Sequence, residues 1–160
     1  MDATFLTDEG IFNYRVAAVM ISRGRVLAMR DDDVPYYYLP GGRVRLHETA
    51  EDAVRRELRE ELSIDAEIIR PLWMHQNFFT DTDRKKQQRC HELCLYFLVD
   101  ASNTGLEKYG ERFILNEDGT RHIFEWFEFG RLRTERVYPL FLRDRISNLP
   151  KHLDMITDFE

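Results

Sequence analysis

The segment from residue 50 to residue 62 places apolar side chains at helical spacing. At about 100° per residue, every third or fourth position falls on the same side of a helix. The apolar stripe formed in this way consists of Ala50, Val54, Leu58 and Leu62, with Ala53 at its edge. The pattern predicts an amphipathic helix whose stripe faces a hydrophobic core.

Polar residues mark the start of this helix. Thr49 followed by Asp52 has the form of a helix start, because the threonine hydroxyl can accept a backbone N–H of the first turn. Glu48 and Glu51 add negative charge near the positive end of the helix dipole. The helix is therefore expected to begin near Thr49.

Segments with the apolar and aromatic content of strands make up most of the remaining chain. The expected strands are residues 11–22, 25–29, 36–39, 66–79, 90–99 and 122–129. The first two are joined by a two-residue turn and are expected to form a hairpin, and a second helix is expected over residues 139–148, entered through a proline. No internal repeat and no break in composition divides the chain, so residues 1–160 are expected to form a single domain.

Three glutamates of the first predicted helix lie within its apolar stripe or at the margin of that stripe. With Val54 at the origin of the helical wheel, Glu61 lies at about −20° and Glu57 at about −60°, inside the stripe, and Glu60 lies near −120° at its margin. The opposite side of the wheel holds Arg55, Arg56 and Arg59. An ionised carboxylate is costly to bury without a partner, so these glutamates need a cation on the core side.

A divalent metal ion is the cation that suits this spacing. Mg²⁺ and Mn²⁺ take oxygen ligands, and Mg²⁺ typically combines a few carboxylates with water and substrate phosphates. Glu57, Glu60 and Glu61, spaced i, i+3 and i+4, can converge on such a cluster. The alternative is a solvated charged face, as on most Glu-rich helices, but glutamates inside an apolar stripe favour the metal site. Just before the helix, the turn formed by residues 40–42, Pro-Gly-Gly, allows the backbone to approach a ligand closely.

The composition narrows the class of protein. A net charge of −6 argues against general affinity for nucleic acid. The first ten residues lack the pattern of a signal peptide and no apolar run approaches about 18 residues, so a cytoplasmic protein without a membrane span is expected. Cys90 and Cys94 are expected on one face of a strand, about 13 Å apart and too far for a disulfide. With His91 between them, their spacing matches no common zinc site.

Residues 42–64 resemble the signature of the Nudix hydrolase family. That signature is Gly, five residues, Glu, seven residues, Arg-Glu, an aliphatic residue, any residue, Glu-Glu, any residue, Gly and an aliphatic residue. The matching positions are Gly42, Glu48, Arg56, Glu57, Leu58, Glu60, Glu61 and Ile64. Ser63 stands where the family has glycine, at a position that usually ends the helix in a left-handed conformation.

The resemblance implies a fold and a reaction. The fold is α/β, an α/β/α sandwich with a mixed β-sheet between helices. The reaction is hydrolysis of a diphosphate linkage in a nucleoside diphosphate derivative or nucleotide, with Mg²⁺ or Mn²⁺ as cofactor. Glu57, Glu60 and Glu61 are carried over as metal ligands, with the backbone at Gly42 close to metal or phosphate, and Arg56 is expected to orient the carboxylates.

The resemblance leaves the catalytic base open. Glu61 is the first candidate within the signature. Because members of the family often recruit a glutamate from outside it, Glu117 and Glu125 are further candidates, and the alternative for each is a surface carboxylate.

The expected partner is a small-molecule nucleotide, and a homodimer is left open. Tyr38 before the glycine turn and Phe78 at the end of a strand are candidates to stack on a nucleobase, with core packing as the alternative. Arg43 is a candidate for binding phosphates. Further candidates for phosphate binding, with solubilising charge as the alternative for the loop residues, are Arg45, Arg84, Lys85 and Lys86.

Three other functions stay open at this level. A pyrophosphohydrolase acting on the 5′ end of RNA would use the same signature, with an RNA path supplied by Arg131, Arg133, Arg136, Arg143 and Arg145. A diphosphate isomerase of related fold would transfer protons at carbon. A non-catalytic nucleotide sensor is the third alternative, and the intact set of three glutamates argues against it.

Overall fold

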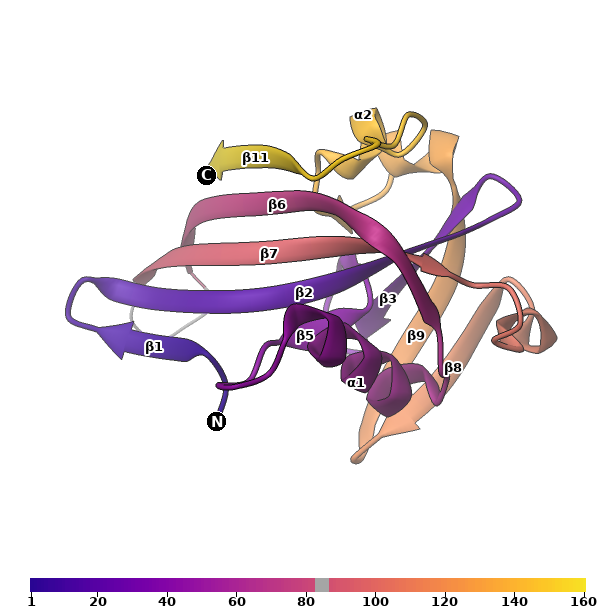
Figure 1. Cartoon of the computed structure of the whole chain (residues 1–160), viewed down its shortest axis with the longest axis horizontal. Coiled ribbons are helices and arrows are strands. Elements are labelled where there is room, and N and C mark those ends of the chain that lie inside the picture. The colour runs from indigo at the N-terminus through magenta and orange to yellow at the C-terminus, as the bar shows by residue number, and fades with distance from the viewer. Residues whose placement is uncertain (83–86) are drawn as a thin grey trace.

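A computed structural model describes residues 1–82 and 87–160 and shows one mixed β-sheet with helices on both faces (Figure 1). The strands are β1 (Thr4–Thr7), β2 (Gly10–Ser22), β3 (Arg25–Asp31), β4 (Tyr37–Tyr38), β5 (Gly41–Arg43), β6 (Glu67–Asp81), β7 (Gln88–Asp100), β8 (Arg112–Glu117), β9 (Thr120–Glu128), β10 (Val137–Tyr138) and β11 (Asp154–Phe159). The helices are α1 (Ala50–Leu62), α2 (Leu142–Arg145) and two 3₁₀ turns, η1 (Leu106–Tyr109) and η2 (Phe129–Arg133).

The long strand β2 lies at the centre of the sheet. The strand order is β10-β4-β3-β2-β7-β6-β11, with β1 and β5 also paired to β2, β9 to β3 and β8 to β9. β2 runs parallel to β7, β11 runs parallel to β6, and β10 runs parallel to β4. All other strand pairs are antiparallel, so the sheet is mixed, as expected.

Alternating residues of β2 divide between two hydrophobic clusters. Val16 and Ala18 pack with the apolar stripe of α1, whereas Ala17 and Val19 pack in a second cluster with Leu142 at the start of α2. Because successive strand residues point to opposite faces, the two helices cover opposite faces of the sheet. In Figure 1, α1 lies below β2 and α2 lies above β6. The expected α/β/α sandwich is confirmed.

Most expected elements are present. The first helix covers residues 50–62, and each expected strand overlaps an observed one. The expected hairpin is formed by β2 and β3, with Arg23 and Gly24 of the turn both at positive φ. Cys90 and Cys94 are both buried in β7 and are not joined by a disulfide. No helix among residues 1–82 and 87–160 is long and apolar enough to cross a membrane.

The second helix is much shorter than expected. The prediction of a helix over residues 139–148 is wrong in extent, since α2 covers only Leu142–Arg145. The chain enters it through a four-residue turn, residues 139–142, in which the N–H of Leu142 donates to the carbonyl of Pro139. Only Leu142 and Ile146 of this segment are buried, one helical turn apart, so only that turn is held against the core.

Candidate active site

Both ends of α1 are fixed by local interactions. The hydroxyl of Thr49 accepts the backbone N–H of Asp52 at 3.1 Å, as the sequence predicts. Ser63 ends the helix in the left-handed conformation, with φ 55°, and its N–H donates to the carbonyl of Arg59 at 3.0 Å. These caps set the register of the helix and therefore the directions of its glutamates.

The glycine turn brings backbone against two of these glutamates. β5 pairs with β2 so that Gly41 lies opposite Ala17 and Gly42 opposite Val16. The N–H of Gly41 donates to Glu61 Oε2 at 3.1 Å. A Cβ atom at Gly42 would collide with the carboxyl group of Glu57, so only glycine permits this approach.

Glu61 is a buried carboxylate with little compensation. Its residue is 8% exposed, and no basic side chain among the described residues lies within ion-pair distance of it. Burial raises the pKa of Glu61 well above its ordinary value, and the negative charges of Glu57 and Glu117 raise it further. The N–H of Gly41 and the more distant charge of Arg15 act in the opposite direction.

Arg56 lies among the other carboxylates of the helix. Its guanidinium donates to both oxygens of Glu48 at 2.8 and 3.0 Å, to Glu57 Oε1 at 2.6 Å, to Glu60 Oε2 at 3.2 Å and to the carbonyl of Arg43 at 2.9 Å. Arg56 lies opposite the apolar stripe on the helical wheel, yet its long side chain reaches Glu57 and also Glu60, which is one turn further along the helix. It forms no ion pair with Glu61, so it serves two of the three glutamates.

The carboxylates of this group therefore differ in their electrostatic environment. The hydrogen bonds from Arg56 lower the pKa of Glu48. Burial raises the pKa of Glu57, and Arg56 only partly offsets that effect. Glu60 is more open, with 39% of its side chain exposed, and it is also 3.6 Å from Arg45. The most buried member of the group, Glu61, is the one without an arginine partner.

The two candidate glutamates outside the signature lie on opposite faces of the sheet. Glu117 shares its face of β8 with Phe113, which packs in the cluster that contains α1, and its charge contributes to the raised pKa of Glu61. Glu125 follows Phe124 in β9 and so points to the other face. There it accepts a hydrogen bond from Tyr37 at 2.9 Å and pairs with Arg131 at 3.0 Å.

His122 ties Glu117 to the rest of the site. Its Nε2 lies 3.1 Å from Glu117 Oε2 and its Nδ1 lies 2.7 Å from Asp31 Oδ1. The hydroxyl of Tyr38 donates to the same Asp31 oxygen at 3.0 Å. Tyr38, Asp31, His122 and Glu117 thus form a chain of contacts on the α1 face.

The carboxylate oxygens are the kind of ligand that a hard divalent cation prefers, although they are not arranged as a complete metal-binding site. Within the described ranges, no three Asp, Glu, His or Cys side chains lie close enough together to form a metal site. Glu57 and Glu60 instead accept hydrogen bonds from Arg56. The donor chemistry nevertheless fits, since Glu57, Glu60 and Glu61 offer only oxygens, and a cation would relieve the repulsion that raises the pKa of Glu61.

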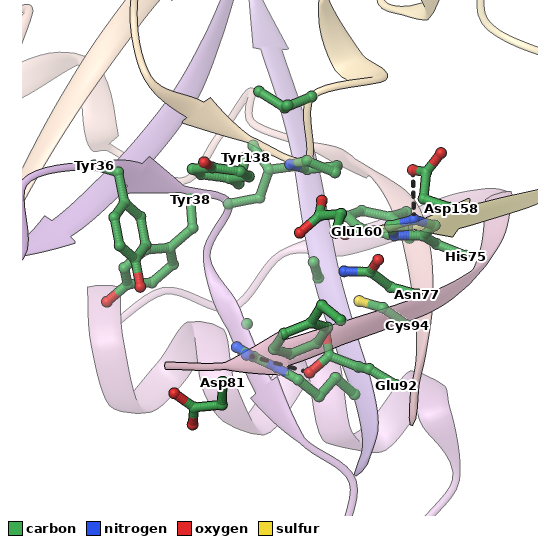
Figure 2. Close-up of a pocket in the computed structure, with 18 of the residues that line it drawn as sticks. Tyr36, Tyr38, His75, Asn77, Asp81, Glu92, Cys94, Tyr138, Asp158 and Glu160 are labelled. Carbon is green, nitrogen blue, oxygen red and sulfur yellow. Dashed lines mark hydrogen bonds and ion pairs between the residues drawn. The ribbon is translucent and has the colours of Figure 1, made fainter. Parts of the chain in front are cut away.

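A cavity of about 770 Å³ reaches this site (Figure 2). Glu61 and Gly41 line it, so it is continuous with the acidic end of α1. Tyr36, Tyr38 and Tyr138 form one wall, and the facing wall comes from β6 and β11. That second wall contains His75, Asn77, Asp158 and Glu160. The lining also includes Arg15 and Glu92, which form an ion pair 3.9 Å apart. The volume suits a nucleoside-sized ligand.

One of the three predicted substrate-binding residues lies in this cavity. Tyr38 lines it, and burial together with Asp31 raises the pKa of its hydroxyl. Arg43 lies outside and is 3.7 Å from Asp2. Phe78 lines a neighbouring hollow of about 470 Å³, where it stacks on Phe159. Their roles stay predictions, and the predicted phosphate ligands Arg84, Lys85 and Lys86 lie outside the described residues.

Sequence reasoning missed the polar wall of the cavity. His75 and Asn77 are two residues apart in β6, and Asp158 comes from the unpredicted strand β11. Residues 73–77 read Trp-Met-His-Gln-Asn, two apolar residues followed by three polar ones, so no period-two alternation marks His75 and Asn77 as members of one face.

Comparisons with known proteins agree with this geometry. A family model described as the NUDIX domain matches residues 12–144. No curated protein matches the chain. Among solved structures, an ADP-ribose pyrophosphatase from Streptococcus suis is 16% identical, with a TM-score of 0.60 over 91% of this chain and 98% of that one. A MutT mutator protein from Bacillus halodurans is 13% identical, with a TM-score of 0.60 over 92% of this chain and 89% of that one.

A third similar structure is that of a UDP-X diphosphatase. It is 15% identical, with a TM-score of 0.52 over 89% of this chain and 66% of that one. The fold and the acidic helix define an enzyme class, the hydrolases that act on phosphoric anhydrides. The chain belongs to the Nudix family, and its box departs from the family signature at Ser63. Nudix hydrolases generally use divalent metals and act on small nucleotide substrates.

Proposed function

We propose that the protein hydrolyses the diphosphate linkage of a nucleoside diphosphate derivative or nucleotide with the help of Mg²⁺ or Mn²⁺. The observation that carries the proposal is Glu61, a buried carboxylate with a raised pKa, placed where α1 meets a cavity of nucleoside size. Burying such a group without an ion-pair partner is costly, so the position is explained best by a bound cation.

In this proposal the residues of α1 have different roles. Glu57, Glu60 and Glu61 would hold the metal, with the backbone at Gly42 close to Glu57. When bound, the metal supplies neutralisation of the diphosphate charge and acidification of water. Arg56 positions the carboxylates through its hydrogen bonds to Glu57 and Glu60.

Glu61 is the residue we assign as the base. Its Oε2 accepts from Gly41, which leaves Oε1 to face a ligand or a proton. Burial and the charges of Glu57 and Glu117 raise its pKa, which makes it a stronger proton acceptor than an ordinary glutamate. Glu117 lies outside the signature, and its negative charge contributes to the raised pKa of Glu61. Glu125 points to the other face of the sheet and pairs with Arg131.

The arginines proposed for an RNA path do not form an open basic surface. Arg131 pairs with Glu125 and Glu135, Arg133 with Asp144, and Arg145 with Asp154. Arg136 lies over the ring of Tyr36, and Arg143 donates to the carbonyl of Leu140. With these charges already engaged, a small nucleotide is favoured over RNA as the substrate.

The test is a panel of nucleotides and nucleoside diphosphate derivatives, incubated with Mg²⁺, with Mn²⁺ or with chelator, and read by the masses of the products. We expect cleavage between two phosphorus atoms in the presence of metal and none in chelator. Cleavage of triphosphate-ended RNA in preference to every small nucleotide would favour the RNA alternative. Absence of cleavage throughout the panel would contradict the proposal.

A further inference from the structure

One face of the sheet forms a side of the cavity, and an arginine projects from it. Arg15 and Ala17 of β2 lie opposite Cys94 and Tyr96 of β7, and all four residues line the cavity. Because alternate residues of a strand point to the same face, the side chain of Arg15 projects from this face toward the cavity. It is 37% exposed, although β2 lies at the centre of the sheet. Arg15 is the only arginine or lysine among the described residues that line the cavity.

The guanidinium of Arg15 is only loosely engaged. Its one ion pair with a described residue joins Nη1 to Glu92 Oε2 at 3.9 Å, and Figure 2 draws it as a dashed line. That distance is too long for a hydrogen bond. Arg56, by comparison, donates to carboxylate oxygens at 2.6–3.2 Å. The N–H donors of Arg15 are therefore available to an anionic ligand, whereas those of Arg56 are occupied.

Arg15 lies beside the proposed metal ligand Glu61 without forming an ion pair with it. Along β2, Arg15 is two residues from Ala17, which lies opposite Gly41, and the N–H of Gly41 donates to Glu61. Burial raises the pKa of Glu61 and of Tyr38, and the positive charge of Arg15 acts against that effect at both residues. A ligand bound to Arg15 is therefore close both to the acidic end of α1 and to the tyrosine wall.

The other charges of the cavity make a second cation valuable for a diphosphate. Apart from Arg15 and the histidine His75, the ionisable groups that dominate the described lining are carboxylates, among them Asp31, Glu61 and Glu92. A diphosphate adds further negative charge, and a metal held by α1 would neutralise only part of it. An arginine suits the remaining charge, because its planar fork can donate two parallel hydrogen bonds to phosphate oxygens.

We infer that Arg15 binds a phosphate group of the substrate, as a second cation beside the metal, and that Glu92 competes with this phosphate for Arg15. The inference rests on the proposed function and deepens it by naming a residue that binds the diphosphate. The alternative is a structural ion pair, in which Arg15 only neutralises Glu92. The two differ in the effect of removing the carboxylate of Glu92, because competition predicts tighter binding of a phosphate ligand and a structural pair predicts no gain.

The first experiment measures binding without any reaction. Titration calorimetry in metal-free buffer gives the affinity of the parent and the variants for inorganic pyrophosphate. We expect Arg15→Gln to weaken binding by roughly 10- to 100-fold, the scale of hydrogen bonds to a charged group, and Glu92→Gln to strengthen it severalfold. Arg25→Gln is the matched control and should bind as the parent does, because Arg25 is a strand arginine that pairs with Glu111 at 2.6 Å and does not line the cavity.

Three results would overturn the inference. They are no binding of pyrophosphate to the parent, unchanged affinity in Arg15→Gln, and weaker binding in Glu92→Gln. A loss of stability in Arg15→Gln does not blur the test, because a double variant, Arg15→Gln with Glu92→Gln, leaves no unpaired carboxylate at this position. The double variant should bind pyrophosphate roughly 10- to 100-fold more weakly than Glu92→Gln alone, whereas a structural pair predicts equal affinities. Arg15→Lys keeps the charge but loses the fork, and its affinity should fall between those of the parent and Arg15→Gln.

Steady-state kinetics separate the inference from the proposed function. With the best substrate of the nucleotide panel and Mg²⁺, Arg15→Gln should raise KM by about tenfold or more and change kcat less, because the contact is made before and during the reaction. Glu92→Gln should lower KM. Pyrophosphate binding that depends on Arg15, with no hydrolysis of any nucleotide, would uphold the inference and contradict the proposed function. Hydrolysis with a KM that does not depend on Arg15 would do the reverse.

Discussion

The poorly compensated burial of Glu61 predicts an effect on stability that can be tested without knowing the substrate. In chelator, Glu61→Gln keeps the shape of the side chain and an acceptor for the N–H of Gly41, but removes a charge buried beside Glu57 and Glu117. A buried polar group without adequate compensation costs roughly 1–3 kcal/mol, and one hydrogen bond to Glu61 remains, so we expect a gain of about 1–2 kcal/mol. At this chain length the melting temperature should rise by about 2–8 °C.

The matched variant is Glu57→Gln. It has a similar position in the helix, but Arg56 donates to Glu57 at 2.6 Å, so neutralising Glu57 removes an ion pair together with a repulsion. Its melting temperature should not rise. Mg²⁺ should raise the melting temperature of the parent through binding to the native state and should have a much smaller effect on Glu61→Gln.

The sign of the pH dependence follows from the raised pKa of Glu61. A carboxyl group whose pKa is higher in the folded state contributes stability below its unfolded pKa, and that contribution is lost as the pH rises through the folded value. The advantage of Glu61→Gln over the parent should therefore be greatest at neutral pH and shrink as the pH falls toward about 4.3, the ordinary pKa of glutamate. Scanning calorimetry in chelator measures this difference. A Glu61→Gln variant that melts below the parent at neutral pH would refute the reasoning.

Three other predictions follow from single residues. Ser63→Gly should stabilise the fold by a few tenths to about 1 kcal/mol in denaturant unfolding, because glycine adopts the left-handed cap more readily, and a tenfold change in turnover would show an unforeseen role for the serine. Gly42→Ala should lower turnover by on the order of 10²-fold in steady-state assays, because the added Cβ displaces Glu57, and normal turnover would contradict that close approach. Glu117→Gln should shift the acidic limb of the kcat/KM profile to lower pH, because removing a negative charge lowers the pKa of the nearby base, whereas Glu125→Gln should leave the limb in place. A loss on the order of 10³-fold in Glu117→Gln without such a shift would indicate that Glu117 is itself the base.

The parts of the site encoded in a continuous segment could be read from the sequence. The position of α1, its Thr49 cap and the burial of Glu61 follow from periodicity and local capping rules, whereas the left-handed conformation at Ser63 is indicated only by the resemblance to the family signature. Helical spacing predicts the i,i+4 contact of Arg56 with Glu60 but not its contacts with Glu48 and Glu57. A helical wheel gives the direction of a Cα–Cβ bond, whereas the four torsions of an arginine side chain decide which carboxylates it reaches.

The cavity could not be predicted because distant segments build it. β11 is an edge strand in which only Ile156 is buried, so residues 154–159 carry little of the alternation by which strands are recognised. β11 nevertheless supplies Asp158 to the wall. The separation of Glu117 and Glu125 onto opposite faces likewise depends on the pairing of β8 with β9 and β9 with β3, which a single sequence does not specify.

The most direct test of the central claim is the rate of phosphoric anhydride cleavage for the best substrate of the panel, measured with Mg²⁺ and with chelator in the parent, Glu60→Gln and Glu61→Gln. The metal-binding role of α1 predicts cleavage that requires the cation and falls by on the order of 10²-fold or more in each variant, because each loses a charged ligand while keeping its size. Full activity of the parent in chelator, or of both variants with Mg²⁺, would contradict the claim that these glutamates bind the catalytic metal.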